Sequence, residues 1–125
     1  SFSGAPAMNL FDGQFSHDGG AFQLADGFVL PLANAQSRWA NQAATLGIRP
    51  EHIRLSSHEA GGIPLTVDTL EILGADNLAH GRWGDRQVVV RLPHVERPAP
   101  GSLLWLHLPM EALHFFSAEH GARLE

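Results

Sequence analysis

The second half of the chain alternates between apolar and polar side chains. In residues 86–92 and again in residues 102–108, every second side chain is apolar, which is the spacing of a half-buried strand. The side chains expected to face the core are Val88, Val90, Leu92, Leu104, Leu106 and Leu108. Residues 65–73 and 77–83 are predicted to be two further strands, and Gly84-Asp85 has the glycine-first order of a tight hairpin turn.

The first half is divided by turn signals. Asp12-Gly13, Asp18-Gly19 and Asp26-Gly27 predict turns that separate four short strands in a meander over residues 7–32. Residues 33–44 are rich in alanine and contain no glycine or proline, so they are predicted to form one short helix. Residues 45–49 read as a strand, 50–52 as one helical turn that starts at a proline, and 53–55 as extended chain.

These elements predict an all-β fold in one domain over residues 1–125. About five strands joined by tight turns are typical of a small barrel of the oligonucleotide/oligosaccharide-binding (OB) type. We expect this barrel in residues 63–125, and the meander, the short helix and the corner at residues 46–52 in residues 1–62.

Composition narrows the possible functions. Eight arginines, no lysine and thirteen acidic residues give a net charge of −5, which disfavours nucleic acid as a partner. Without lysine the chain lacks the phosphate-binding loop of nucleotide hydrolases, so we expect no ATP hydrolysis by this chain alone. There is no cysteine, no recognisable signal peptide and no apolar stretch of membrane-spanning length. Because the chain starts at Ser1, we expect it to be a piece of a longer protein.

No set of residues indicates catalysis or metal binding. Asp68 and Glu71 are three apart on a strand and therefore point to opposite faces. The eight histidines do not have ligand spacing, and Ser56-Ser57-His58 lacks a nucleophile elbow. We therefore predict no catalytic residue and no metal site.

Six residues are candidates for a regulatory or interface role. Arg49, Glu51 and His52 lie where a strand meets a helical turn, where they could present charge to a partner; alternatively, Arg49 and Glu51 hold the corner by a local ion pair. Trp39 and Trp83 are interface candidates, while Trp105 is expected to belong partly to the core. Asp76, which follows the break after residue 73, completes the set.

Three segments resemble one known family. Leu46-Gly47-Ile48-Arg49-Pro50-Glu51-His52-Ile53 is similar to the marker peptide of the regulatory domain, TOBE/MOP-like and of OB type, that follows the ATPase domain in carbohydrate-type ABC import subunits. Residues 4–9 resemble its interdomain segment, and residues 113–121 its closing strand. Within the family, residues 67–84 look most like the subunit of the glycerol-3-phosphate importer.

The resemblance implies a regulatory and dimerisation role without chemistry. In such subunits two copies pair, and ATP and magnesium bind in the upstream ATPase domain, which also contacts the membrane permease subunits. The resemblance also implies a peripheral position on the cytoplasmic side of the bacterial inner membrane, and a docking place for an inhibitory protein or a small metabolite. The alternative is a sensor module that binds a small oxyanion or metabolite, for which arginine would supply the donors.

Overall fold

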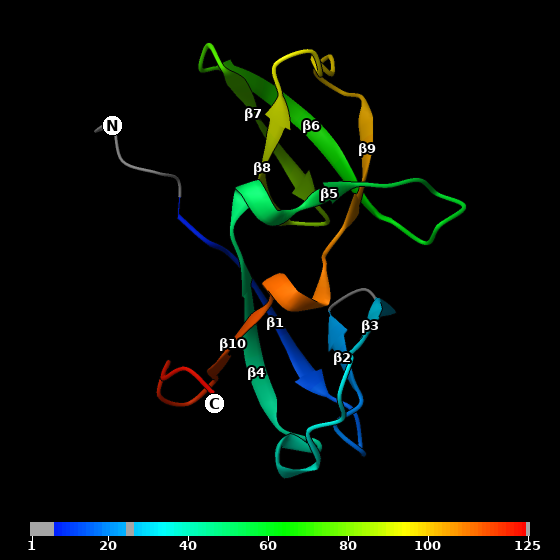
Figure 1. The fold of residues 1–125 in the computed structure, drawn as a ribbon, viewed down its shortest axis with the longest axis vertical. Helices are drawn as coiled ribbons and strands as arrows, with labels where there is room; N and C mark the ends of the chain where they lie inside the picture. Colours follow the sequence, from blue (N-terminus) through cyan, green and yellow to red (C-terminus); the bar gives the residue numbers. More distant parts are fainter. Residues whose placement is uncertain (1–6, 25–26, 125) are drawn as a thin grey trace. The chain divides into compact units, whose positions relative to one another are not determined.

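The fold is all-β, as predicted. The structure is a computed structural model that describes residues 7–24 and 27–124. Within them the strands form two five-stranded sheets (Figure 1), and the chain divides into two compact units. Over the described residues, the N-terminal unit comprises residues 10–24, 27–47 and 110–124, and the central unit comprises residues 7–9 and 48–109. Each unit contains one sheet.

The sheet of the N-terminal unit has the strand order β10-β4-β1-β2-β3. Its strands are β1 (Asn9–Phe15), β2 (Ala21–Leu24), β3 (Val29–Pro31), β4 (Ala43–Ile48) and β10 (His114–Ser117). Single 3₁₀ turns precede β4 at η2 (Ser37–Trp39) and β10 at η4 (Met110–Ala112). β10 pairs antiparallel with β4, so the end of the chain returns to a sheet that begins near residue 9.

Two predictions for this unit are wrong. The helix expected over residues 33–44 is reduced to the turn η2, and Ala43 and Ala44 already belong to β4, because pairing with neighbouring strands overrides the helix propensity of alanine. Asp12-Gly13 makes no turn and lies inside β1, so residues 7–24 and 27–32 contain three strands and not four. The Asp26-Gly27 turn cannot be assessed, because Asp26 lies outside the described residues.

The glycine in β1 has a packing role. A Cβ atom at Gly13 would lie 2.4 Å from the Gln23 carbonyl oxygen and 2.5 Å from the Phe22 ring. Only glycine lets β1 approach β2 this closely. The Asp-Gly pair therefore marks a close backbone contact.

Aromatic residues fill the N-terminal unit. Phe15 and Phe22 are 1% and 0% exposed, and their ring centroids lie 5.0 Å apart in an edge-to-face arrangement. Phe115 from β10 packs on both, with centroid distances of 4.9 and 5.0 Å. These rings come from both ends of the sequence, so the core of this unit forms only when β10 returns to β4.

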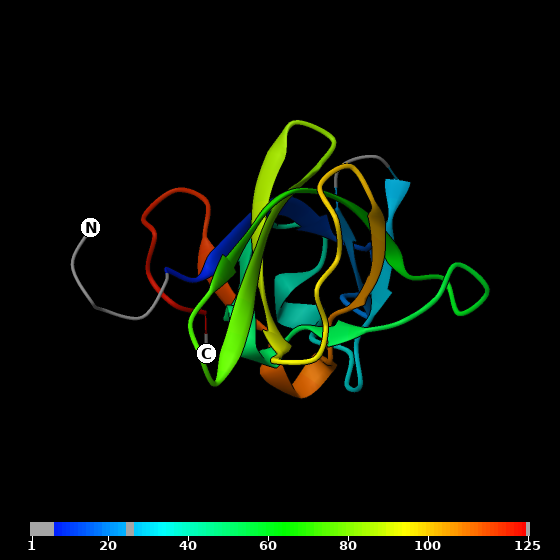
Figure 2. The same ribbon diagram turned by 90° about the horizontal axis from the view of Figure 1, so that it is seen from above.

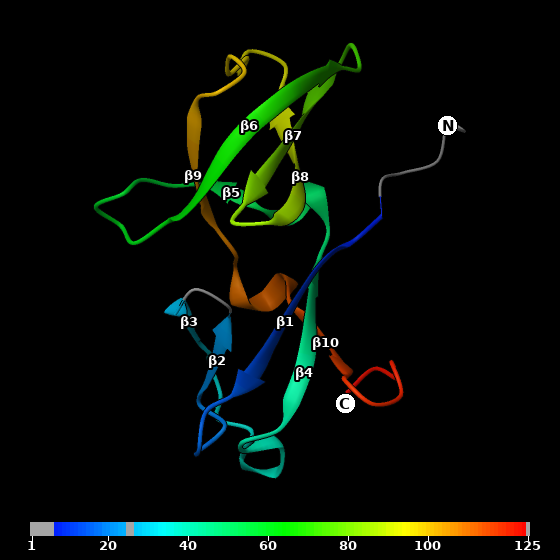
Figure 3. The same cartoon turned by 180° about the vertical axis from the view of Figure 1, so that it is seen from behind.

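The sheet of the central unit has the order β5-β9-β6-β7-β8. Its strands are β5 (Arg54–Leu55), β6 (Ile63–Ile72), β7 (Asp76–Trp83), β8 (Arg86–Pro93) and β9 (Leu103–His107), and η3 (Pro50–His52) precedes β5. The β6–β7 ladder has a register shift between Val67 and Thr69, which marks a β-bulge. Figure 2 shows these strands curled, and the loop of residues 56–62 projects from the sheet in Figures 1, 2 and 3.

The alternation seen in the sequence gives the core of this unit. Val88, Val90 and Leu92 are 1%, 0% and 2% exposed, and Leu106 and Leu108 are 2% and 4% exposed, as predicted. Gly84 has φ of 62°, in the left-handed region that the predicted hairpin turn requires.

The sheets divide the chain differently from the predicted boundary at residue 62. β5, from the first half, pairs with β9 in the central sheet, and β10, from the second half, pairs with β4 in the other sheet. The chain passes between the two units after residues 9, 47 and 109. Neither unit is therefore one continuous stretch of sequence.

No helix in residues 7–24 or 27–124 is both long enough and apolar enough to cross a membrane. Over the same residues, no three or more histidine, aspartate or glutamate side chains come together where they could hold a metal ion.

Candidate functional site

The predicted corner is a single 3₁₀ turn. Arg49 is extended, with φ −76° and ψ 147°, and buried Pro50 occupies the first position of the turn, where its fixed φ suits the geometry. The His52 backbone N–H donates to the Arg49 carbonyl at 3.0 Å and closes the turn. The side chains of Arg49 and Glu51 are exposed, whereas the Nδ1 atom of His52 is buried with no hydrogen-bond partner among the described residues. The histidine ring is therefore partly packed inside.

This turn borders a hollow of about 390 Å³, which we call the corner hollow. It is lined by Glu51, Ile53, Arg54, Leu55, Asp76, Arg91, Leu92 and Pro93, all from the central unit. The fold thus brings together two of the predicted candidates, Glu51 and Asp76, which are 25 positions apart in the sequence. Arg49 and His52 lie on the same turn but do not line the hollow.

The charges around the corner hollow are held by specific contacts. Arg91 Nη1 donates to Asp76 Oδ2 at 2.6 Å, and both side chains are less than one third exposed. Arg54 Nη1 donates to the Glu51 carbonyl oxygen at 3.1 Å. In the part of the chain that the structure describes, no ion pair joins Arg49 to Glu51, so the local pair stays a prediction. The contact that does link the turn to β5 is the hydrogen bond from Arg54 to the Glu51 carbonyl.

Sequence reasoning missed the two arginines of the hollow. Arg91 alternates with Val90 and Leu92 along β8, and its partner Asp76 is brought to it only by the β7–β8 ladder, in which Asp76 pairs with Pro93 and Leu78 with Arg91. For Arg54 the sequence did contain a signal. Arg54 follows Glu51 by three positions across a predicted turn, a spacing at which a side chain can reach a backbone carbonyl.

The three tryptophans occupy different environments. Trp83 is 5% exposed and belongs to the core, so its prediction as a surface anchor is wrong: in β7 it alternates with exposed Arg82 and shares its face with buried Ala79. Trp39 is half-buried in the N-terminal unit. Trp105 is half-buried, as expected, and its ring lies 5.0 Å from that of His58 in an edge-to-face contact.

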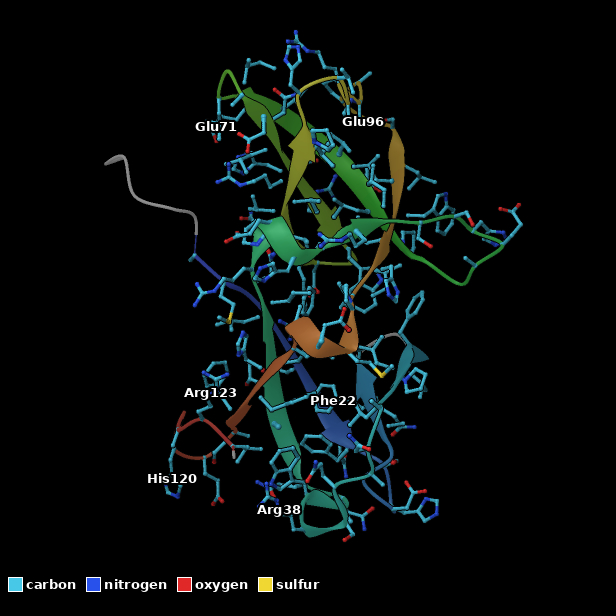
Figure 4. All side chains as sticks on the ribbon, in the orientation of Figure 1. Phe22, Arg38, Glu71, Glu96, His120 and Arg123 are labelled. Carbon is cyan, nitrogen blue, oxygen red and sulfur yellow. The ribbon has the colours of Figure 1, made fainter. Side chains whose placement is uncertain are left out.

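The segment Asp76-Asn77-Leu78-Ala79-His80, which lies within the resemblance at residues 67–84, has structural contacts along its whole length. Asn77 is fully buried, and its Nδ2 donates to the carbonyls of His94 and Glu96 at 3.1 and 3.0 Å. Leu78 and Ala79 are buried, and His80 Nε2 lies 2.9 Å from Glu71 Oε1. The labelled Glu71 and Glu96 lie at one end of the central unit (Figure 4), so this segment organises that end.

The exposed acids of the sheet are used in pairing. Arg82 donates from Nε and Nη2 to both carboxylate oxygens of Asp68 at 3.0–3.2 Å. These hydrogen bonds, and then the charge of Arg82, lower the pKa of Asp68 below its ordinary value of 3.8. A carboxylate held ionised in this way is an acceptor and a poor proton donor, so the pair does not form a general acid.

Comparison with known proteins gives the family. The TOBE domain family matches residues 46–116, which is more than half of the chain, and the MalK OB fold domain family matches residues 4–53. The chain belongs to the TOBE domain family. The resemblance found at residues 46–53 is thereby confirmed. The OB match falls on the first half of this TOBE chain, where we had expected a meander, and not on residues 63–125.

Individual relatives of the chain narrow the comparison from a domain family to one kind of protein. The TOBE chain is 60% identical over 124 residues to the sn-glycerol-3-phosphate import ATP-binding protein UgpC of Salmonella paratyphi A, and 58% identical to the proteins of the same name from Escherichia coli O157:H7 and Shigella sonnei. Each alignment covers 99% of this chain and 35% of the relative. The chain therefore spans about a third of the length of these curated relatives.

Proposed function

We propose that this chain is the regulatory and dimerisation part of the ATP-binding subunit of an ABC importer for sn-glycerol 3-phosphate or glycerophosphodiesters. The single observation that carries the proposal is the identity of 58–60% over 99% of the chain to sn-glycerol-3-phosphate import ATP-binding proteins. The charged pairs of the central unit hold strands and turns together, which suits a part that transmits or receives contacts and does no chemistry.

In this proposal the remainder of the subunit carries the reaction. An ATPase domain binds ATP and magnesium, and through it the subunit contacts the membrane permease subunits. The subunit then works at the cytoplasmic face of the bacterial inner membrane as a peripheral protein, paired with a second copy of itself. The chain described here supplies part of the contact between the copies and a docking surface for an inhibitory protein or metabolite.

The test uses the full-length subunit that contains this chain, reconstituted with its permease and binding subunits in vesicles. Uptake of labelled glycerol 3-phosphate driven by ATP is the expected result, and uptake of maltose under the same conditions is the comparison. Transport of maltose and not of glycerol 3-phosphate would remove the substrate assignment. Sedimentation of the full-length subunit tests pairing, since a strict monomer at high concentration contradicts it.

A second candidate function, the sensing of a small oxyanion, is favoured by the corner hollow. Arg54 and Arg91 both line it, and each is already oriented by one hydrogen bond, which lowers the entropic cost of holding a phosphate or carboxylate. Glu51 and Asp76 line the same hollow and oppose an anion. Calorimetric titration with phosphate, glycerol 3-phosphate and molybdate is expected to show heat that Arg54→Ala abolishes and the exposed control Arg97→Ala keeps; no heat with any of the three would leave the scaffold role alone.

A further inference from the structure

A second hollow, of about 260 Å³, lies entirely in the N-terminal unit. We call it the Trp39 hollow; it is lined by Leu32, Ala33, Asn34, Gln36, Trp39, Met110, Glu111 and Phe115. Its residues come from the segment around η2 and from η4 and β10, so strand pairing of β10 with β4 assembles it.

Two aromatic rings form inclined walls of this hollow. The ring centroids of Trp39 and Phe115 are 6.3 Å apart, with an interplanar angle of 49°. Phe115 is held from behind by Phe15 and Phe22, which are buried; Figure 4 labels Phe22 among the strands of this unit. The walls are therefore fixed by the core, and no folding step is needed to form them.

The Trp39 ring already attracts a cation. The guanidinium carbon of Arg38 lies 4.9 Å from the ring centroid, within the range of a cation–π interaction. Arg38 does not line the hollow; Figure 4 places it on the η2 turn. The indole thus interacts favourably with a cation in this protein, and Arg38 is a competitor for that ring.

The charge of the hollow suits a cation. Among the described residues that line it, Glu111 is the one charged side chain, and it is exposed on η4. Asn34 and Gln36 add neutral polar groups, while Leu32 and Met110 add apolar surface. An anion would meet the Glu111 carboxylate, whereas a cation would meet complementary charge there and the π systems of Trp39 and Phe115. Arg38, beside the Trp39 ring, is the neighbouring positive charge that a bound cation has to tolerate.

We propose that the Trp39 hollow binds a small compound that carries a quaternary ammonium group, such as choline. The methyl groups of such a cation contact the rings, Leu32 and Met110, and its charge is balanced by Glu111. A quaternary ammonium needs no hydrogen-bond acceptor and is desolvated at lower cost than a primary ammonium, whose three N–H groups each require a partner. The proposal is independent of the transporter function.

The test is a titration of the full 125-residue chain with choline, tetramethylammonium, methylammonium and 3,3-dimethylbutan-1-ol, the neutral analogue of choline. The chain has three tryptophans, so its NMR spectrum has three indole N–H signals, and saturable movement of the Trp39 signal is expected. Because 3,3-dimethylbutan-1-ol has the shape of choline without its charge, we expect it to bind about tenfold more weakly than choline. Equal binding of the alcohol, tighter binding of methylammonium, or no binding of choline overturns the proposal.

Substitutions locate the site. Glu111→Gln, a surface change that keeps the fold, is expected to weaken choline binding about two- to fivefold, and Glu119→Gln, at an exposed glutamate of the same unit outside the hollow, is the matched control. Trp39→Leu is expected to remove binding and Trp39→Phe to retain part of it. Unchanged affinity in both Glu111→Gln and Trp39→Leu would contradict the assignment.

Discussion

The side chain of Asn9 closes an open strand edge, and its removal gives a sharp test of how the central unit is held. β8 is an edge strand of its sheet, so the outward backbone groups of Val89 have no neighbouring strand. Asn9 is 6% exposed and takes that place: its Nδ2 donates to the Val89 carbonyl at 2.9 Å, and its Oδ1 accepts from the Val89 N–H at 2.8 Å. The same Nδ2 also lies 3.3 Å from the Ile48 carbonyl.

The expected cost of Asn9→Ala follows from these contacts. A buried backbone group left without a partner costs about 1–3 kcal/mol, and two groups of Val89 lose theirs. Val89 is half-buried, so water can reach it and the lower end of the range applies to each group. We expect a loss of about 2 kcal/mol in the free energy of unfolding of the central unit. If this loss of about 2 kcal/mol lowers the free energy of local opening around Val89, amide exchange at Val89 becomes about 30-fold faster.

Hydrogen exchange at the Val89 amide, followed by NMR, is the direct assay, and the urea midpoint of unfolding is the second. Gln87→Ala is the matched control, because Gln87 is exposed on the same strand, and its effect is expected to stay within about 0.5 kcal/mol. Asn9→Asp keeps the acceptor but loses the donors, so its penalty should shrink at low pH, where a protonated carboxyl group can donate again. Unchanged exchange at Val89 in Asn9→Ala would refute the reasoning.

Three further predictions concern the central sheet. Asn77→Ala should free the turn that its Nδ2 holds, lower stability by about 1–3 kcal/mol and speed cleavage after Glu96 by a glutamate-specific protease; resistance equal to that of the parent chain would argue against a clamp. Gly81→Ala should place a Cβ atom 2.4 Å from the Thr66 carbonyl oxygen and lower the thermal midpoint, at a cost of about 1–3 kcal/mol; an unchanged midpoint would show that β6 and β7 can separate freely. The lowered pKa of Asp68 means that its pairing with Arg82 contributes to stability above about pH 3.8, and that this contribution is lost as the pH falls through the pKa of the folded state. Asp68→Asn should therefore make stability, measured by urea unfolding, fall less steeply as the pH is lowered. A slope identical to that of the parent chain would exclude this contribution.

The sequence determined the local elements that depend on near neighbours. Alternation of side chains gave the strands of residues 86–92 and 102–108 and their buried faces, because burial of one face of a strand requires a period of two. Pro50 and Gly84 gave the turns at their positions, because each residue restricts or permits a particular φ. The resemblance at residues 46–53 also indicated the family from the sequence alone, because the motif that carries it is short and contiguous.

The tertiary structure decided which strands share a sheet and which residues share a site. β10 joins β4 and β5 joins β9, although the paired residues are more than 50 positions apart in the sequence, and no local pattern encodes such partners. Residues 33–44 lost their predicted helix to strand pairing, and Trp83 became core because β7 turns that face inward. The partners of Asn9, Asp76 and Asn77 likewise exist only after folding, because a side-chain hydrogen bond depends on distance in space, which the order of residues alone does not fix.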